Sequence, residues 1–115
     1  MPAPIYKICP EELWRAAERN GRFDGAPVDL ADGYIHFSAA DQVRETAARY
    51  FKGEDQLLLI AVDPDALGDA LRWEPSRDGA LFPHLYAPLA PKAALSVVPL
   101  PLRPDGSHDF PADIP

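Results

Sequence analysis

The sequence predicts a single α+β domain built on a split, mostly antiparallel sheet with two main helices. The first half of the chain alternates strand-like and helix-like segments, and the second half is mostly strand-like, an order typical of this class. The length of 115 residues lies near the commonest size of one domain. We expect residues 1–100 to form this domain, and residues 101–115, rich in proline and polar side chains, to form a loosely ordered tail.

The first helix is bounded by residues with known preferences for helix ends. A short strand is predicted over residues 4–8, where side chains of different character alternate. Pro10 then stands in the favoured first turn of a helix, and Asn20 with Gly21 forms a pair that tolerates the left-handed conformation at its end. Residues 22–32, which contain glycine and proline, are predicted to form a loop.

The spacing of apolar residues predicts the remaining elements. A strand at residues 33–38 runs into a second helix at about residues 39–52, in which apolar side chains recur at helical spacing. Residues 56–62 are apolar on both faces, which predicts a central strand covered on both sides. Further strands are predicted at residues 70–74, 81–87 and 93–100. Because Pro83 lacks a ladder donor, its strand is expected at an edge or beside a bulge.

The composition limits the compartment and the partners. The net charge of −7, from 11 basic and 18 acidic residues, repels a phosphate backbone and disfavours a nucleic acid polymer as partner. Cys9 is the single cysteine, which excludes an internal disulfide and suits a reducing compartment. The longest apolar run, Leu57–Val62, is far shorter than the roughly 20 residues that span a bilayer. We therefore expect a cytoplasmic protein with no membrane partner.

The stretch G-Y-I-H-F-S, at residues 33–38, carries the densest chemical signal. With a period of two, Ile35 and Phe37 share a core face, and the other face carries Tyr34, His36 and Ser38. Ser38 and Asp41 match the spacing of a capping box, so we interpret Ser38 as the N-cap of the second helix. The same helix start could also present its free N–H groups to an anion.

A second histidine changes the interpretation of His36. Alone, His36 is explained by a half-buried ring that satisfies a backbone carbonyl. The segment F-P-H-L-Y, however, puts His84 in another extended stretch, on the same face as Phe82 and Tyr86. Two strand histidines flanked by aromatic rings suit a cleft for a flat, polar ligand, whereas simple core packing is the alternative for the aromatic residues.

Three charged residues lie in predicted strands. Arg72 and Glu74 share a face and could form a solvated pair, but Glu74 is also the best-placed carboxylate for general-base work or for holding a ribose hydroxyl. Lys7 lies inside an apolar strand, where burial would lower its pKa or require an anion. The alternative for Lys7 is a guard against aggregation at a sheet edge.

Two other kinds of site are disfavoured. His36, His84, Glu74 and Cys9 could supply metal ligands, but no H-x-H, H-x-x-x-H or C-x-x-C spacing is present, so no metal is expected. A serine triad is disfavoured because the chain has no G-x-S-x-G elbow. Cys9 has no second cysteine to resolve an oxidised form, and we interpret it as structural.

The motifs G-Y-I-H-F-S and F-P-H-L-Y-A-P-L resemble those of a bacterial family of short proteins, domain-of-unknown-function family 952, over about residues 5–100. A more distant likeness is to the ADP-ribosyltransferase fold, especially its RNA 2′-phosphotransferase branch. The segments that stand in the same order are I-Y-K-I, G-Y-I-H-F-S, L-L-L-I-A-V-D-P and D-G-A-L-F-P-H-L-Y. This second resemblance implies a cleft that holds NAD or an ADP-ribose-like group.

By that resemblance His36 and Ser38 would contact a ribose or a nicotinamide-like amide, with Tyr86 or His84 across the cleft. The sequence departs from the transferases in two places. Lys7 stands where they have a histidine, and their transition-state glutamate has no clear counterpart. The acidic surface also disfavours an RNA substrate, and likeness of fold is not evidence of activity.

Two functions therefore stay open. The first is a nucleotide-binding cleft with ADP-ribosyl or glycosyl-type transfer chemistry, in which His36 orients the ribose, His84 or Glu74 acts as acid or base, and Lys7 neutralises phosphate. The wider set of expected ligand-binding residues is Lys7, Tyr34, Ser38, Arg72, Phe82 and Tyr86. The second is a non-catalytic binding or protein-interaction module that keeps the fold without the chemistry.

Overall fold

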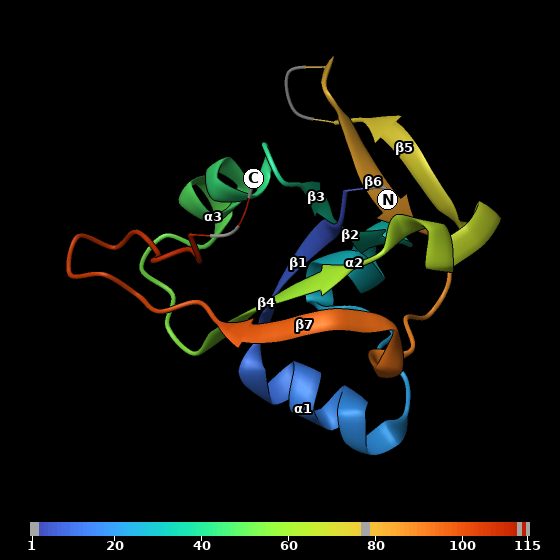
Figure 1. Cartoon of the computed structure of the whole chain (residues 1–115), viewed down its shortest axis with the longest axis horizontal. Coiled ribbons are helices and arrows are strands. Elements are labelled where there is room, and N and C mark those ends of the chain that lie inside the picture. Colours follow the sequence, from blue (N-terminus) through green and yellow to red (C-terminus); the bar gives the residue numbers. More distant parts are fainter. Residues whose placement is uncertain (1–2, 77–78, 113, 115) are drawn as a thin grey trace.

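Two antiparallel sheets form the framework of the domain (Figure 1). The computed structural model describes residues 3–76, 79–112 and 114. The larger sheet has the order β3-β1-β4-β7, with bounds Ser38–Ala39, Ile5–Pro10, Leu57–Val62 and Ala94–Pro99. The smaller sheet has the order β2-β6-β5, with bounds Ile35–His36, Leu81–Leu85 and Leu71–Pro75. The fold is thus a mixed helix-and-strand domain with mostly antiparallel sheets and few helices.

Helices cover both faces of the larger sheet (Figure 1). On one face α1, Glu11–Asn20, buries Trp14 and Ala17 in a cluster that also includes residues of β1, β4 and the smaller sheet. On the other face α3, Val43–Tyr50, buries Val43 and Ala47. The short helix α2, Pro27–Asp32, and the 3-10 segments η1, Pro64–Ala70, and η3, Pro91–Ala93, complete the helical part.

The elements with strong local signals form where they are predicted. Pro10 is the N-cap of α1, and Gly21 ends that helix in the left-handed conformation, with φ +78°. Every residue of β4 is buried because hydrophobic clusters lie on both of its faces. This strand lies between β1 and β7, so the prediction of a doubly covered central strand is confirmed.

The loop predicted over residues 22–32 is wrong in its second half, which forms α2. Pro27 lies in the first turn of this helix, where its missing N–H costs nothing. The Asp29 carboxylate accepts the backbone N–H of Ala26 at 2.8 Å, which satisfies one of the free donors at the helix start. Gly33 then ends the helix in the left-handed conformation, with φ +89°.

The strand predicted over residues 33–38 is divided between the two sheets. Ile35 and His36 pair with β6, whereas Ser38 and Ala39 form β3 beside β1. The second helix starts later than expected, because its N-cap is Gln42. The interpretation of Ser38 as the N-cap is therefore wrong, and its hydroxyl instead lies 2.9 Å from that of Thr46.

The strand that contains Pro83 is not at an edge, because β6 lies between β2 and β5. The Pro83 carbonyl accepts the Phe37 N–H at 3.0 Å, so it points toward β2. Because the N–H and C=O of one strand residue point to the same side, the missing donor of Pro83 is also on the β2 side and not on the β5 side. Since β2 ends at His36, the missing donor lies where that ladder stops. The end of β2 thus allows a proline in a middle strand.

The C-terminal segment packs against the larger sheet on the side of α3. Leu102 and His108 form an isolated bridge, and the His108 Nε2 lies 2.8 Å from the Glu54 carbonyl oxygen. Ile114 is buried in the same cluster as Val43, and Phe110 packs against it. Within the described residues, no helix is long and apolar enough to cross a membrane.

Candidate functional site

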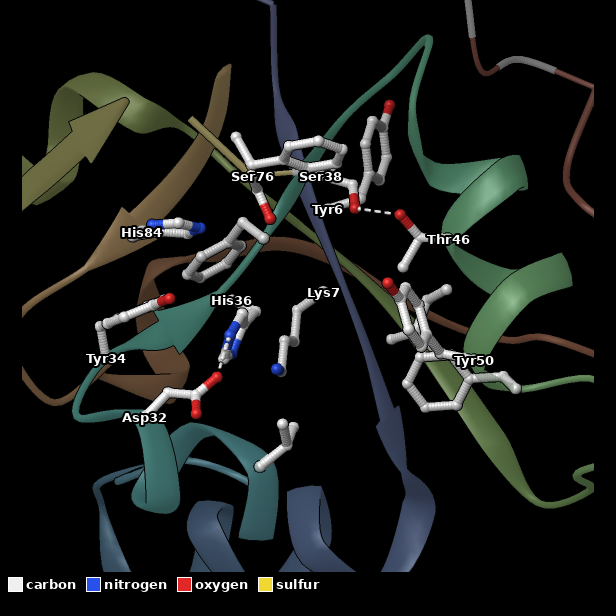
Figure 2. A pocket seen from close by; sticks show the side chains of 15 residues that line it. Tyr6, Lys7, Asp32, Tyr34, His36, Ser38, Thr46, Tyr50, Ser76 and His84 are labelled. Carbon is white, nitrogen blue, oxygen red and sulfur yellow. Dashed lines mark hydrogen bonds and ion pairs between the residues drawn. The ribbon is translucent and has the colours of Figure 1, made fainter. Parts of the chain in front are cut away.

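A cavity of about 510 Å³ lies between β1, the start of β3, the smaller sheet, α2 and α3 (Figure 2). Its volume is in the range of about 300–1,000 Å³ found for small-molecule sites. The residues that line it are Tyr6, Lys7, Ile8, Val28, Asp32, Tyr34, His36, Phe37, Ser38, Thr46, Tyr50, Phe51, Ser76, Phe82 and His84. Imidazole and carboxylate groups lie on one side of this cavity, and the Ser38 and Thr46 hydroxyls lie on the other (Figure 2).

The two strand histidines meet on the wall of the cavity. His36 of β2 and His84 of β6 are direct partners in the antiparallel ladder, so their side chains project from the same face of the sheet. Their ring centroids are 5.6 Å apart, in an edge-to-face arrangement. The structure thus brings His36 and His84 together on the wall of one cavity, and their sharing a functional site stays a prediction.

Tyr34 joins the two imidazoles. Its ring stacks on His84, with centroids 4.2 Å apart, and lies 4.6 Å from the His36 ring. The Tyr86 ring belongs to the same aromatic cluster, with its centroid 5.2 Å from that of Tyr34. Burial, followed by the charges of Asp32 and Glu74, raises the pKa of Tyr34, so its hydroxyl stays protonated at neutral pH.

Asp29 organises the base of this site, although no pattern in the sequence points to it. Its side chain is buried, and both of its carboxylate oxygens accept from the Lys7 ammonium, at 2.8 and 3.0 Å. The same carboxylate accepts the backbone N–H of His36 at 3.1 Å and lies 2.6 Å from the His36 Nδ1. One acidic side chain from α2 therefore positions a residue of β1 and a residue of β2.

These partners keep Asp29 ionised. Burial by itself raises the pKa of a carboxyl group, but the hydrogen bond from His36, the charge of Lys7 and the hydrogen bonds from Lys7 and Ala26 outweigh it. The pKa of Asp29 is lowered from 3.8 to about 2. Lys7 is consequently a buried ion-pair partner, and the edge-strand interpretation of this lysine is wrong, because β1 lies between β3 and β4.

His36 is held between two carboxylates. Its Nδ1 faces Asp29, and its Nε2 lies 3.0 Å from the Asp32 Oδ2, an ion pair visible in Figure 2. Asp32 was not predicted either, because a loop was expected where the structure has α2, the helix that carries both aspartates. A proline followed two residues later by aspartate is a first-turn signal that could have identified this helix.

His84 has a carboxylate partner of its own. Its Nδ1 lies 2.9 Å from the Glu74 Oε1, and the Tyr86 hydroxyl donates to the same oxygen at 2.7 Å. The hydrogen bonds from Tyr86 and then from His84 hold the pKa of Glu74 below its usual range. The bond to Glu74, followed by burial, raises the pKa of Tyr86.

The expected catalytic and ligand-binding residues thus fall into two groups. The first group lines the cavity and consists of Lys7, Tyr34, His36, Ser38, Phe82 and His84. The second group, Glu74, Tyr86 and Arg72, is not part of the lining; it supports His84, with the Arg72 guanidinium 5.0 Å from the Tyr86 ring. Burial raises the pKa of the Cys9 thiol to about 11, which suits an unreactive core residue.

Within the described part of the chain, no three potential ligands among histidine, cysteine, aspartate and glutamate come together as a metal site. Two polar residues of the cavity wall, Lys7 and His36, are instead paired with Asp29.

A family model described as "Protein of unknown function (DUF952)" matches residues 8–97. The chain belongs to the DUF952 family. Solved structures of protein CC0527 from Caulobacter crescentus are similar to this DUF952 protein along most of its length. The crystal structure is 48% identical, covers 93% of this chain and 94% of that chain, and has a TM-score of 0.90. The solution NMR structure is 50% identical, covers 90% of each chain, and has a TM-score of 0.82.

No curated protein matches this DUF952 protein. The family and the two structures establish the fold shared with CC0527, and their names state no ligand or reaction. The likeness to ADP-ribosyltransferases therefore stays a prediction from the sequence motifs.

Proposed function

We propose that the cavity of this DUF952 protein binds a small nucleotide of the NAD or ADP-ribose class. The observation that carries the proposal is the grouping of Tyr34, His36 and His84 at one end of a cavity of about 510 Å³. Aromatic and imidazole side chains offer apolar contact area together with hydrogen-bond donors and acceptors, the combination that a flat heterocycle requires.

The opposite side of the cavity suits the sugar of such a ligand. The Ser38 and Thr46 hydroxyls lie 2.9 Å apart, and hydroxyl groups can donate to or accept from a ribose. Lys7 has a different role from the one expected, because both oxygens of Asp29 compensate its ammonium. Lys7 is thus a support of the cavity wall rather than the group that neutralises a phosphate.

Transfer of an ADP-ribosyl or glycosyl group is the catalytic form of this proposal. His84, supported by Glu74, is the candidate acid or base on the wall, and His36 is the candidate for orienting a ribose. Turnover is tested separately from binding by measuring the nicotinamide released from NAD by chromatography.

The binding proposal is tested by thermal unfolding with NAD, with ADP-ribose and with neither. We expect each nucleotide at millimolar concentration to raise the melting temperature by several degrees, since a ligand that binds only the folded state stabilises it. The shift should shrink in Tyr34→Ala, and it should persist in the matched control Arg15→Ala, a residue exposed on α1. The absence of any shift in the wild-type protein contradicts the proposal.

One observation favours a non-catalytic interaction module as the second candidate. The Lys7, Asp29 and His36 side chains satisfy one another inside the protein, which is also what a purely structural network would show. This candidate predicts no thermal shift with either nucleotide and no release of nicotinamide. A positive shift in the wild-type protein that Tyr34→Ala reduces rejects it.

A further inference from the structure

We propose that His84 recognises the ligand through a fixed tautomer, in which Nδ1 carries the proton and Nε2 accepts a hydrogen bond from the ligand. The inference rests on the proposed function and adds the substrate class. The ring of the ligand must carry an N–H or O–H donor, as a primary amide does. A ligand with a carboxylate in the same place is rejected. Glu74 and Tyr86 are the positioning residues for this choice.

The tautomer follows from the partner of Nδ1. The Glu74 Oε1 lies 2.9 Å from this nitrogen, and an ionised carboxylate only accepts hydrogen bonds. Glu74 is ionised at neutral pH because the Tyr86 hydroxyl also donates to the same oxygen, at 2.7 Å. The His84 Nδ1 must therefore be the donor, and in the neutral ring Nε2 keeps its lone pair.

The ring cannot turn freely to exchange the two nitrogens. The His84 side chain is 4% exposed, and Tyr34 stacks on it with an interplanar angle of 28°. In the described part of the chain no partner is found for the Nε2, and His84 lines the cavity, so this nitrogen is left for a ligand. Figure 2 shows the ring reaching from β6 toward the interior of the cavity.

His36 cannot take the same role. Both of its nitrogens face carboxylate oxygens, Asp29 at 2.6 Å and Asp32 at 3.0 Å, so neither nitrogen is left to accept a hydrogen bond from a ligand. The two rings on the cavity wall thus differ in kind, and only His84 offers an acceptor.

A ligand that covers the Nε2 without bringing a donor would leave its lone pair unpaired. Such a ligand should bind about five- to 150-fold more weakly. A carboxylate at this position would also place a second negative charge near Glu74. Nicotinamide and nicotinate form a suitable pair of probes, because they differ only in an amide against a carboxylate on the same ring.

The tautomer is tested directly by NMR of protein labelled with ¹⁵N at histidine. The chain has 3 histidines, and His84 and His108 are expected in opposite tautomers. His84 should be protonated on Nδ1 alone. His108, whose Nε2 faces the Glu54 carbonyl oxygen at 2.8 Å, should be protonated on Nε2. A His84 spectrum with the proton on Nε2, or on both nitrogens, overturns the inference, whether or not any ligand binds.

Ligand discrimination is tested by titrating nicotinamide and nicotinate into the same protein. We expect nicotinamide to bind at least about fivefold tighter than nicotinate, and the ratio of affinities to fall toward one in Glu74→Gln, whose amide can either donate to or accept from the Nδ1. The matched control Glu18→Gln, at an exposed pair on α1, should keep the ratio. Tyr86→Phe should reduce the ratio of the two affinities without changing the cavity lining, because Tyr86 contacts Glu74 and does not line the cavity.

The outcomes separate this inference from the proposed function. A thermal shift with NAD together with equal affinities for nicotinamide and nicotinate overturns the role of His84 and leaves the nucleotide-binding proposal intact. Failure of both nicotinamide and nicotinate to bind also overturns that role. The expected His84 tautomer without any shift by NAD or ADP-ribose rejects the proposed nucleotide and keeps the acceptor at Nε2.

Discussion

Asp29 shows how one residue can hold a site together without lining it. Its buried carboxylate, carried by α2, accepts from Lys7, from the Ala26 backbone and from His36. Two charges removed from water are costly unless their remaining hydrogen-bonding capacity is satisfied, and here the backbone N–H groups provide that satisfaction. The orientation of His36 on the cavity wall therefore depends on Asp29.

We expect the stability of the protein to fall in acid because of Asp29. The carboxyl has a pKa of about 2 in the folded protein against 3.8 ordinarily. A lowered folded pKa contributes stability that is complete above the unfolded pKa and is lost as the pH falls from about 4 toward 2. That contribution is about 2 kcal/mol.

Urea unfolding at a series of pH values between 5 and 2 measures this contribution. Asp29→Asn should remove it from the pH profile and lower the stability at pH 7, since Lys7 then loses its buried anion. The control Asp24→Asn, in an exposed pair with Arg22, should keep the wild-type profile. Equal slopes for the wild-type protein and Asp29→Asn would contradict the prediction.

At the scale of elements, the segment from Gly25 to Gly33 positions both aspartates of the site. Pro27 starts α2, and the helix carries Asp29 and Asp32 on successive turns toward His36. Gly25 has a φ of +125°, and a Cβ there would lie 2.7 Å from the Cβ of Asp29. The close approach of this turn to Asp29 thus requires glycine.

Substitution of the two glycines separates backbone strain from the close approach. Gly33→Ala should cost about 1–2 kcal/mol, because its φ is +89° but nothing lies within 4 Å of the new Cβ. Gly25→Ala should cost more, since it also displaces Asp29, and it should disturb the His36 signals in the ¹⁵N spectrum. Equal losses in urea unfolding, with unchanged His36 signals, would show that the contact to Asp29 does not matter.

At the scale of the molecule, the C-terminal segment contributes to the packing of the larger sheet. The segment after β7 brings Ile114 into the cluster on the α3 side of the larger sheet, where it is 8% exposed. Burial of this side chain is a contact that the expected loose tail would lack. Residues 113 and 115 lie outside the described part of the chain.

Ile114→Ala should therefore destabilise the protein by about 2 kcal/mol or more in urea unfolding, the range for removing a buried aliphatic side chain. The matched control is Leu95→Ala on β7, where the side chain is 62% exposed. This control should change the stability by less than about 0.5 kcal/mol. A loss no greater for Ile114→Ala than for the control would support the loosely ordered tail.

Local chemistry in the sequence determined the parts of this protein that depend on neighbours along the chain. Proline and glycine set the ends of α1, continuous apolarity set the doubly covered strand β4, and alternation placed His36 away from the Ile35 core face. Alternation also grouped His84 with Phe82, and both line the cavity with His36.

Only the tertiary structure decided which of these groups meet. The separation of Ser38 from His36 into another sheet, the central place of β6 and the pairing of Asp29 with Lys7 each depend on a segment distant in the chain. A charged side chain buried in a strand needs an anion, but its sequence context does not say where that anion lies. For the same reason the sequence did not show that the Glu74 carboxylate lies beside the His84 Nδ1.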